Sequence, residues 1–374
     1  MSVAAQQLAD GRLIVVKVGS TLVVDEATGD IRRDWLMALA DDVAMLRARG
    51  QQVVIVSSGA IAAGRRRLGF RSRTLRLEEN QASAAVGMIR IAHAFQDALG
   101  RHDIPVAQAL LTLEDSETRR RYLNARSTFT TLLELGAVPL INENDTVATD
   151  EIRFGDNDRL SARVAAMISA DTLVLLSDID GLYTADPRID PAAEFVPVVT
   201  SITGQIEASA GATQTDYGTG GMKTKIAAAR IALGGGCRMA IAQGRLNNPL
   251  RRLDETGRAT WFVPEDGPKA ARKQWILGSL AGSGGLTIDA GALKALQSGR
   301  SLLPAGVTAI DGDFDRGDAI TVCDPAGRVI ARGLSAYSSA DARLLAGRKS
   351  SEIEALLGYR GRDELIHRDD LVMT

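Results

Sequence analysis

The sequence predicts an α/β fold in which helices cover both faces of a mainly parallel sheet, followed by a small β-rich domain. Up to residue 242, short apolar runs alternate with helical segments, the pattern of a parallel sheet with crossover helices. Beyond residue 286, the pattern changes to short strands separated by turns. Each apolar run of the first part ends in small or polar residues. The loops after the strands should therefore meet at one edge of the sheet, where ligands bind.

Length and composition are those of a protein with two globular domains. The chain has 374 residues, too many for one compact core. A hydrophobic fraction of 45% and a charged fraction of 24% are ordinary for globular proteins. We place the first domain at residues 1–265, a linker at 266–284 and the second domain at 285–374. The Gly-Ser-Gly-Gly run at 282–285 marks the end of the linker.

Charge, histidine and cysteine usage exclude several function classes. The net charge of −2 gives no general attraction to nucleic acid or to an anionic membrane. No apolar run reaches the roughly 18 residues that a membrane helix needs, and the first residues lack the pattern of a signal peptide. Cys237 and Cys323 have no CxxC partner, and the three histidines are scattered, so neither a zinc cluster nor a histidine-based triad is indicated. We expect a cytoplasmic protein with reduced thiols and no membrane contact.

Apolar runs define the strands, and the segments between them define the helices. The strands of the first sheet are predicted at 13–18, 53–56, 106–111, 137–141 and 172–177, with a further strand at 238–242. Helices are predicted at 35–49, 61–64, 80–100, 122–135, 159–168 and 226–233. Residues 244–284 show little clear periodicity. In the second domain, strands are predicted at 302–307, 317–323 and 328–330.

Lys17 stands out in the first strand. It lies inside an apolar run close to the carboxyl end of the strand, and lysine is rarely buried without a partner. Because ligands bind at the carboxyl ends of strands in open α/β sheets, Lys17 is a candidate ligand contact. The alternative is an edge strand on which Lys17 faces water.

Small and polar residues follow other strands at the same predicted edge. Ser57 and Ser58 begin a strand-to-helix turn of small residues, which lets a ligand approach the backbone closely. Five polar residues at 142–146 follow the fourth strand and suit a polar pocket. Asn157 and Asp158 precede the helix at 159, where helix capping explains one of the neighbouring polar side chains but not all of them.

A glycine-rich stretch at 218–225 leads into the helix at 226. Its free backbone N–H groups and the positive end of the helix dipole suit a phosphate group. Lys225 falls in the first turn, where its charge opposes the dipole, and a bound anion would account for a cation there. The stretch is not a Walker A loop, because Met222 replaces the glycine before Lys223. The alternative is an ordinary turn with a solvated lysine.

This set of residues suits phosphoryl transfer, in which catalysis is mostly positioning and charge neutralisation. Lys17 and Lys225 are expected to hold the transferring group and to screen its repulsion from an anionic acceptor. Asp158 is expected to orient the lysines, and Asp145 and Asn157 to bind the ammonium and polar end of an amino acid. A carboxylate acceptor needs no general base, because it is ionised at neutral pH with a pKa of about 4. Beyond this charge argument, the residues leave the acceptor open.

The whole chain resembles the amino acid kinase superfamily and, within it, the glutamate 5-kinases, which carry a C-terminal PUA domain. Each matching motif is weak alone, but all of them occur in this order over nearly the full length. In the first domain they are VKVGS at 16–20, VSSGAIAAG at 56–64, LNAR at 123–126, INEND at 141–145, GDND at 155–158, GLYTADPR at 181–188 and GTGGMKTK at 218–225. In the second domain they are SLLP at 301–304, LGY at 357–359 and HRDD at 367–370.

The resemblance implies a three-layer αβα sandwich with a β-rich PUA domain, and ATP-dependent phosphorylation of the γ-carboxylate of L-glutamate to L-glutamyl 5-phosphate, the first step of proline biosynthesis. It implies that Lys17 and Lys225 contact the phosphates, that Asp158 arranges them, and that glutamate is bound by Ser58, Asp145 and Asn157. The implied nucleotide site comprises Lys17, Ser177, Asp178, Thr219, Gly220, Gly221, Met222, Lys223, Thr224 and Lys225.

The resemblance also implies partners, and the sequence departs from the family pattern at two positions. The implied partners are Mg²⁺ held largely by the phosphates rather than by a protein ligand, feedback inhibition by proline at or near the glutamate site, and a homo-oligomer, either a dimer or a tetramer. Ser177 stands where threonine is more usual, which keeps the hydroxyl. Lys223 stands where a small residue such as serine is common, so that it either adds affinity for phosphate or points to solvent.

Two rival functions have some support in the sequence. PUA domains often bind RNA, and six arginines fall between Arg65 and Arg76, although a solvated helix end and loop is the simpler interpretation of that run. Residues 284–374 contain 11 Lys and Arg and 13 Asp and Glu, whereas an RNA-binding surface is basic, so RNA binding is not expected as the main function. Within the superfamily, the alternative is an acetylglutamate or aspartate kinase, which the appended domain and residues 155–158 disfavour.

Overall fold

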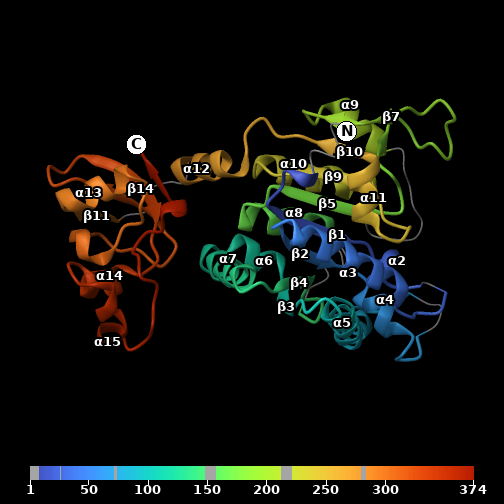
Figure 1. Ribbon diagram of the computed structural model, residues 1–374, viewed down its shortest axis with the longest axis horizontal. Coiled ribbons are helices and arrows are strands. Elements are labelled where there is room, and N and C mark those ends of the chain that lie inside the picture. The colour runs from blue at the N-terminus through green and yellow to red at the C-terminus, as the bar shows by residue number, and fades with distance from the viewer. Residues whose placement is uncertain (1–7, 26, 71–73, 148–156, 212–220, 279–283) are drawn as a thin grey trace. The chain divides into compact units, whose positions relative to one another are not determined.

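The computed structural model describes residues 8–25, 27–70, 74–147, 157–211, 221–278 and 284–374 (Figure 1). The chain forms two compact units. The first unit comprises Met1–Thr118 and Asn124–Pro268, and the second comprises Arg119–Leu123 and Lys269–Thr374. Within the ranges described, no helix combines the length and the apolar character needed to cross a membrane.

The first unit contains an eight-stranded sheet. Its strands are β1 (Leu13–Val18), β2 (Gln52–Ser57), β3 (Val106–Leu111), β4 (Val138–Glu143), β5 (Thr172–Ser177), β8 (Val198–Val199), β9 (Arg238–Gln243) and β10 (Ala259–Phe262). They are arranged in the order β3-β4-β2-β1-β5-β9-β10-β8, and the six strands from β3 to β9 are parallel. β10 runs antiparallel to β9 and parallel to β8. The carboxyl ends of the six parallel strands therefore lie at one edge of the sheet, as predicted.

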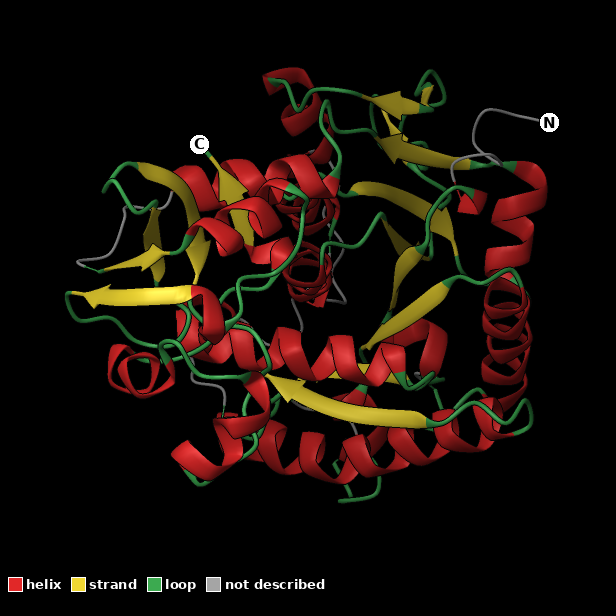
Figure 2. Ribbon diagram, turned by 60° about the vertical axis from the view of Figure 1, so that its left-hand side comes forward, coloured by secondary structure: helices red, strands yellow, loops and turns green. Residues whose placement is uncertain are grey.

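Helices cover both faces of this sheet (Figure 2). On one face, α3 (Arg33–Ala48), α4 (Ala60–Arg65), α5 (Leu77–Gly100) and α11 (Pro249–Thr256) share a core with Ile14, Val16 and Val18 of β1. Successive side chains of a strand point to opposite faces, so Lys17 points to the other one. The helices α8 (Asn157–Ile168) and α10 (Met222–Gly234) lie on that face. Asp158 of α8 forms an ion pair with Lys17, and Lys225 of α10 pairs with the same carboxylate. These three layers confirm the predicted fold class.

Several short elements connect or flank these layers. The small strands β6 (Leu182–Tyr183) and β7 (Phe195–Val196) pair with each other outside the main sheet. The remaining helices that begin before residue 268 are α2 (Ser20–Val23), α6 (Leu113–Glu117), α7 (Arg119–Glu134) and α9 (Gly204–Gly211). The helix α7 corresponds to the helix predicted at 122–135 and begins three residues earlier.

The second unit is built around a five-stranded sheet. Its strands are β11 (Gly285–Ile288), β12 (Val307–Asp311), β13 (Ala319–Cys323), β14 (Val329–Leu334) and β15 (Leu371–Met373), in the order β12-β11-β13-β14-β15. β11 and β13 are parallel, and the other neighbours are antiparallel. The helices are α12 (Pro268–Gly278), α13 (Ala290–Gln297), α14 (Ser339–Leu345) and α15 (Ile353–Leu357), with 3₁₀ turns at Pro304–Gly306, Ser350–Glu352 and Arg368–Asp370. The β-rich character predicted for this domain is confirmed.

The strand predicted at 302–307 is wrong. Leu302 forms only an isolated bridge with Ile366, Pro304–Gly306 is a 3₁₀ turn, and the strand β12 begins at Val307. Pro304 has no backbone N–H to donate to a neighbouring strand, which explains the interruption. The sequence also missed β11 and β15, which have four and three residues.

The stretch at 244–284, which showed little periodicity, contains α11, β10 and α12. The helix α12 lies within the residues assigned to the linker. It belongs to the second unit, where Arg272 Nη2 lies 2.5 Å from Asp370 Oδ1. Ile276 is fully buried against Ala319 and Val372. The amphipathic pattern of α12 is too short to be distinguished from a loop in the sequence.

Two glycines allow α4 and α5 to pack closely. A Cβ atom at Gly87 of α5 would overlap the carbonyl oxygen of Ala60, and one at Gly64 of α4 would overlap that of Ser83. α4 begins directly after Ser58 and Gly59, and Gly59 has a φ of +100°, which favours glycine. The contact between α4 and α5 therefore holds the turn that follows β2.

We predict that Gly87→Ala lowers the free energy of unfolding by about 1–3 kcal/mol, because α4 and α5 must move apart to admit the methyl group. Thermal unfolding would measure the loss as a lower Tm. Gly100→Ala is the matched control in the same helix, because nothing lies within 4 Å of its added Cβ. That control should unfold at the wild-type temperature or slightly above it, and an equal loss in both variants would contradict the packing argument.

Candidate active site

Three predicted residues form one buried ion cluster at the carboxyl edge of the sheet. Asp158 Oδ1 lies 2.7 Å from Lys17 Nζ, and Asp158 Oδ2 lies 3.2 Å from Lys225 Nζ. Lys17, Asp158 and Lys225 are exposed by only 7%, 1% and 6%. A buried charge is tolerated when it is paired, and here one carboxylate serves two ammonium groups. The cluster has a net charge of +1, which suits an anionic ligand.

Each residue of this cluster comes from a different element. Lys17 is near the end of β1, Asp158 is the second residue of α8, and Lys225 is the fourth residue of α10. Burial opposes ionisation of Asp158, but the charges of Lys17 and Lys225 outweigh it and hold the pKa of Asp158 well below its usual range. Asp158 is therefore a carboxylate at every physiological pH. The alternative in which Lys17 faces water on an edge strand is wrong, because β1 lies between β2 and β5.

The first residue of α8 joins a second group of predicted residues. Asn157 Nδ2 donates hydrogen bonds to Ser58 Oγ at 2.9 Å and to the carbonyl oxygen of Ser57 at 3.0 Å. The backbone N–H of Ser58 donates to the carbonyl oxygen of Val18, which ties the turn after β2 to the end of β1. Asn157 Oδ1 is buried and accepts no hydrogen bond within the part of the chain that is described. It is thus an acceptor available to a ligand.

Acidic residues at the end of β4 form the neighbouring wall. Glu143 and Asp145 are buried, with exposures of 8% and 6%, and Asn142 is buried beside them. Burial, and then the negative charge of Glu143, raise the pKa of Asp145 to about 7. An incoming cation would relieve both effects, so this wall suits an ammonium group. Glu143 belongs to the predicted polar run at 142–146 but was not singled out in the sequence.

Two of the residues predicted to bind nucleotide, Ser177 and Asp178, lie at the end of β5, the strand that flanks β1 on the side away from β2. Ser177 ends β5 and donates a hydrogen bond to Asp178 Oδ1 at 3.1 Å. Asp178 Oδ2 lies 3.6 Å from Arg245 Nη2, just beyond the end of β9. Arg245 is a neighbour that the sequence did not reveal, because it follows a separate strand by two residues.

The glycine-rich stretch is described only from Gly221 onward, and Thr219 and Gly220 lie outside the described residues, as do Gly155 and Asp156. Gly221 precedes α10, Met222 is buried in its first turn and Lys223 is exposed. Thr224 Oγ1 lies 2.9 Å from Asp158 Oδ2. The structure thus separates the two lysines of this stretch, because Lys225 enters the ion cluster while Lys223 faces outward.

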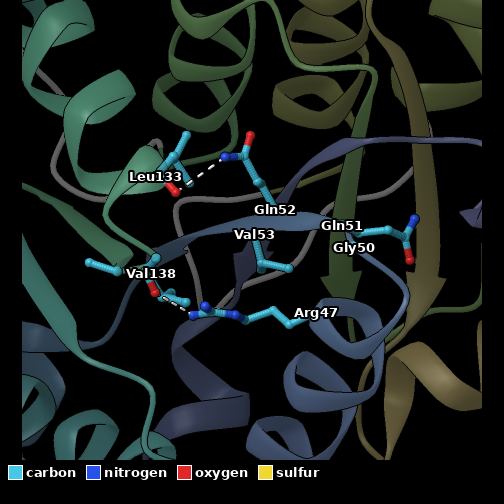
Figure 3. Close-up of a pocket in the computed structure, with 9 residues that line it drawn as sticks. Arg47, Gly50, Gln51, Gln52, Val53, Leu133 and Val138 are labelled. Atoms are coloured by element: carbon cyan, nitrogen blue, oxygen red, sulfur yellow. Dashed lines mark hydrogen bonds between the residues drawn. The ribbon is translucent and has the colours of Figure 1, made fainter.

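A cavity lies at the opposite edge of the sheet (Figure 3). Its volume is about 200 Å³, and it opens at the amino ends of β2 and β4. Of its lining polar groups, Arg47 Nη1 donates to Gly136 O at 2.6 Å and Gln52 Nε2 donates to Leu133 O at 3.2 Å. Gln51 Oε1 is buried and accepts no hydrogen bond within the described residues. None of the predicted site residues lines it. We place the functional site at the carboxyl edge, where buried charges and an available acceptor converge.

Comparisons with known proteins identify the family of the chain. The amino acid kinase family matches residues 12–243, and the PUA domain matches residues 284–357. A curated glutamate 5-kinase of Paramagnetospirillum magneticum is 63% identical over 366 residues, covering 98% of this chain and 99% of the relative. Those of Rhodospirillum rubrum and Agrobacterium fabrum are 59% and 55% identical, covering 96% and 100% of this chain and 96% of each relative.

These matches confirm the resemblance that the sequence motifs indicated. The two families match consecutive parts of the chain, at residues 12–243 and 284–357, and the three curated relatives each align over nearly their whole length. The chain belongs to the amino acid kinase family and, within it, to the glutamate 5-kinases that carry a PUA domain.

Proposed function

We propose that this chain transfers the γ-phosphoryl group of ATP to the γ-carboxylate of L-glutamate, forming L-glutamyl 5-phosphate, the first step of proline biosynthesis. The observation that carries the proposal is the buried Lys17–Asp158–Lys225 cluster at the carboxyl edge of the sheet. It occurs in a chain that is 63% identical to a curated glutamate 5-kinase over nearly its whole length.

In the proposed complex, the phosphates lie against the ion cluster and the amino end of α10. Lys17 and Lys225 place positive charge on both sides of Asp158, and the helix dipole adds to it. Ser177 and Asp178, with Gly221, Met222, Thr219 and Gly220, border the rest of the nucleotide. The exposed Lys223 is left to solvent.

In this proposal, glutamate lies at the ends of β2 and β4, on the side of β1 away from β5. Its α-ammonium group meets Asp145 and the available Oδ1 of Asn157, and Ser58 contributes its hydroxyl. This placement would give a partner to the buried side-chain oxygen of Asn157, which has none among the described residues, and would favour ionisation of the buried Asp145. The γ-carboxylate then points toward the lysines.

The transfer itself needs charge neutralisation more than proton transfer. An oxygen of the γ-carboxylate attacks the γ-phosphorus, a new O–P bond forms, and the bond to the leaving ADP oxygen breaks. The acceptor is already ionised, so no base has to remove a proton. The two lysines screen the repulsion between the carboxylate and the phosphates and stabilise the negative oxygens during transfer.

Mg²⁺ bound by the phosphates is part of the proposal. The donor set fits this arrangement: lysines cannot ligate a metal ion, and both oxygens of Asp158 face ammonium groups. Among the residues described, no group of three His, Cys, Asp or Glu side chains is arranged to hold a metal. The ion would supply further neutralisation of the phosphate charges.

Proline inhibition, a homo-oligomer and a cytoplasmic location complete the proposal. Proline shares the ammonium and α-carboxylate of glutamate, so it would compete for the wall formed by Asp145 and Asn157. A dimer or tetramer is implied by the resemblance.

The substrate assignment predicts that ATP turnover with L-glutamate gives an acyl phosphate that hydroxylamine traps as a hydroxamate. N-acetylglutamate and aspartate should give little, because the first lacks the ammonium group and the second is one methylene shorter. Hydroxamate from either of these compounds, but none from glutamate, would overturn the assignment.

We predict that Lys225→Ala reduces kcat by about 10²–10³-fold, because a charge that stabilises the transferring phosphoryl group is lost. The fold should survive, since Asp158 keeps its contact with Lys17. Lys223→Ala removes an exposed lysine two residues away in the same helix and is the matched control. Hydroxamate formation and the Tm of both variants would test this, and comparable losses in kcat would refute the distinction between the two lysines.

We predict that glutamate binds more tightly as the pH rises through about 7, because only ionised Asp145 attracts the ammonium group. Below that pH, the dissociation constant should rise toward tenfold per pH unit. Calorimetric titration of the protein with glutamate at pH 6, 7 and 8, without ATP, would measure it. Glu143→Gln removes the neighbouring charge, so the midpoint should move to lower pH. An affinity independent of pH in the wild type would contradict the role of Asp145.

A further inference from the structure

The hydroxyl group of Thr224 contacts the ion cluster directly. Its Oγ1 lies 2.9 Å from Asp158 Oδ2, the same oxygen that lies 3.2 Å from Lys225 Nζ. It also lies 2.8 Å from the carbonyl oxygen of Gly221, at the start of α10. The sequence grouped Thr224 with the residues that line the nucleotide, so this contact gives it a different neighbour.

The chemistry of these partners determines which way the hydrogen bond runs. Asp158 is ionised, because its two lysines hold its pKa low, and a carboxylate can only accept hydrogen bonds. The carbonyl oxygen of Gly221 is also only an acceptor. Thr224 must therefore donate its single hydroxyl proton toward this pair of acceptors. A phosphate oxygen is a third acceptor, and it could receive that proton only if the bond to Asp158 were given up.

The local backbone holds the hydroxyl in this direction. Thr224 is the third residue of α10, and a β-branched side chain has few allowed χ1 rotamers in a helix. Its contact with the carbonyl oxygen three residues earlier is one that a helical threonine commonly adopts. This rotamer keeps Oγ1 within hydrogen-bond distance of Asp158 Oδ2 as well as of the Gly221 carbonyl oxygen before any ligand binds, and the single proton is shared between these two acceptors.

We propose that Thr224 is a positioning residue whose hydroxyl holds the carboxylate of Asp158 between Lys17 and Lys225, and that it does not bind the nucleotide. With this bond, Asp158 has one oxygen on each lysine, and rotation of the carboxylate is opposed. Without it, the carboxylate can rotate, and its two oxygens no longer hold the ammonium groups of Lys17 and Lys225 in fixed positions. The inference rests on the proposed phosphoryl transfer, because its effect is on the transfer step.

The test compares Thr224→Val, which keeps the shape but removes the hydroxyl, with Thr224→Ser, which keeps the hydroxyl. Thr224→Val should lower kcat for glutamate phosphorylation about tenfold or more, the size expected for a hydrogen bond to a charged group. The dissociation constant of ATP, from calorimetry, should stay within about twofold. Thr224→Ser should recover most of kcat. A tenfold weaker ATP affinity with unchanged kcat would instead assign Thr224 to nucleotide binding and overturn the proposal.

A double-mutant cycle with Asp158→Asn separates the two roles further. If Thr224 acts through Asp158, the loss caused by Thr224→Val should be at least about threefold smaller when residue 158 is already asparagine. Equal losses in both backgrounds would contradict the proposal. Thr224→Ala provides a second variant without the hydroxyl if Thr224→Val does not fold. A wild-type chain without glutamate kinase activity would contradict the proposed function, whereas an active wild type with an unaffected Thr224→Val would contradict the positioning role alone.

Discussion

The carboxylate of Asp158 between two lysines is the interaction on which this site depends. Three charged side chains are removed from water, which is tolerated only because each charge faces an opposite one. The cluster also fastens together a central strand and two helices that are far apart in the sequence, since Lys17, Asp158 and Lys225 belong to β1, α8 and α10. Its net charge of +1 leaves an excess that an anionic ligand can neutralise. The same buried charges thus hold three elements together and supply the positive charge that the proposed phosphate contacts require.

The start of α8 joins the two halves of the proposed reaction. Consecutive helical residues point about 100° apart around the axis, so Asn157 and Asp158 face different neighbours. Asn157 reaches Ser58 at the turn after β2, whereas Asp158 reaches the lysines of β1 and α10. One helix end can therefore fix the distance between a bound amino acid and a transferring phosphoryl group. The buried pair Glu143 and Asp145 adds a wall that favours a cationic group, since neither acid is well solvated there.

Predictions from the sequence succeeded where local chemistry is strong. Lys17 inside an apolar run required a buried partner, and the structure supplies Asp158. The parallel strands and their helices followed from long apolar runs, and the polar loops after them gathered at one edge as expected. The failures occurred where the local signal is weak or misleading. Pro304 interrupts an apolar run that resembled a strand, and α12 is a short helix in a stretch assigned to a linker.

The sequence by itself determined the fold class, the edge of the sheet at which the proposed site lies and the residue types that meet there, because apolar periodicity and strand-end polarity are local properties. Only the tertiary structure decided which polar groups touch. Lys223 and Lys225 stand two residues apart in one glycine-led helix, yet one is exposed and the other is buried against Asp158, because positions two apart face nearly opposite sides of a helix. Thr224, which stands between them, also contacts Asp158, with its Oγ1 at 2.9 Å from Oδ2. Such pairings join residues some 65 positions apart, a distance over which sequence spacing carries no information about contact.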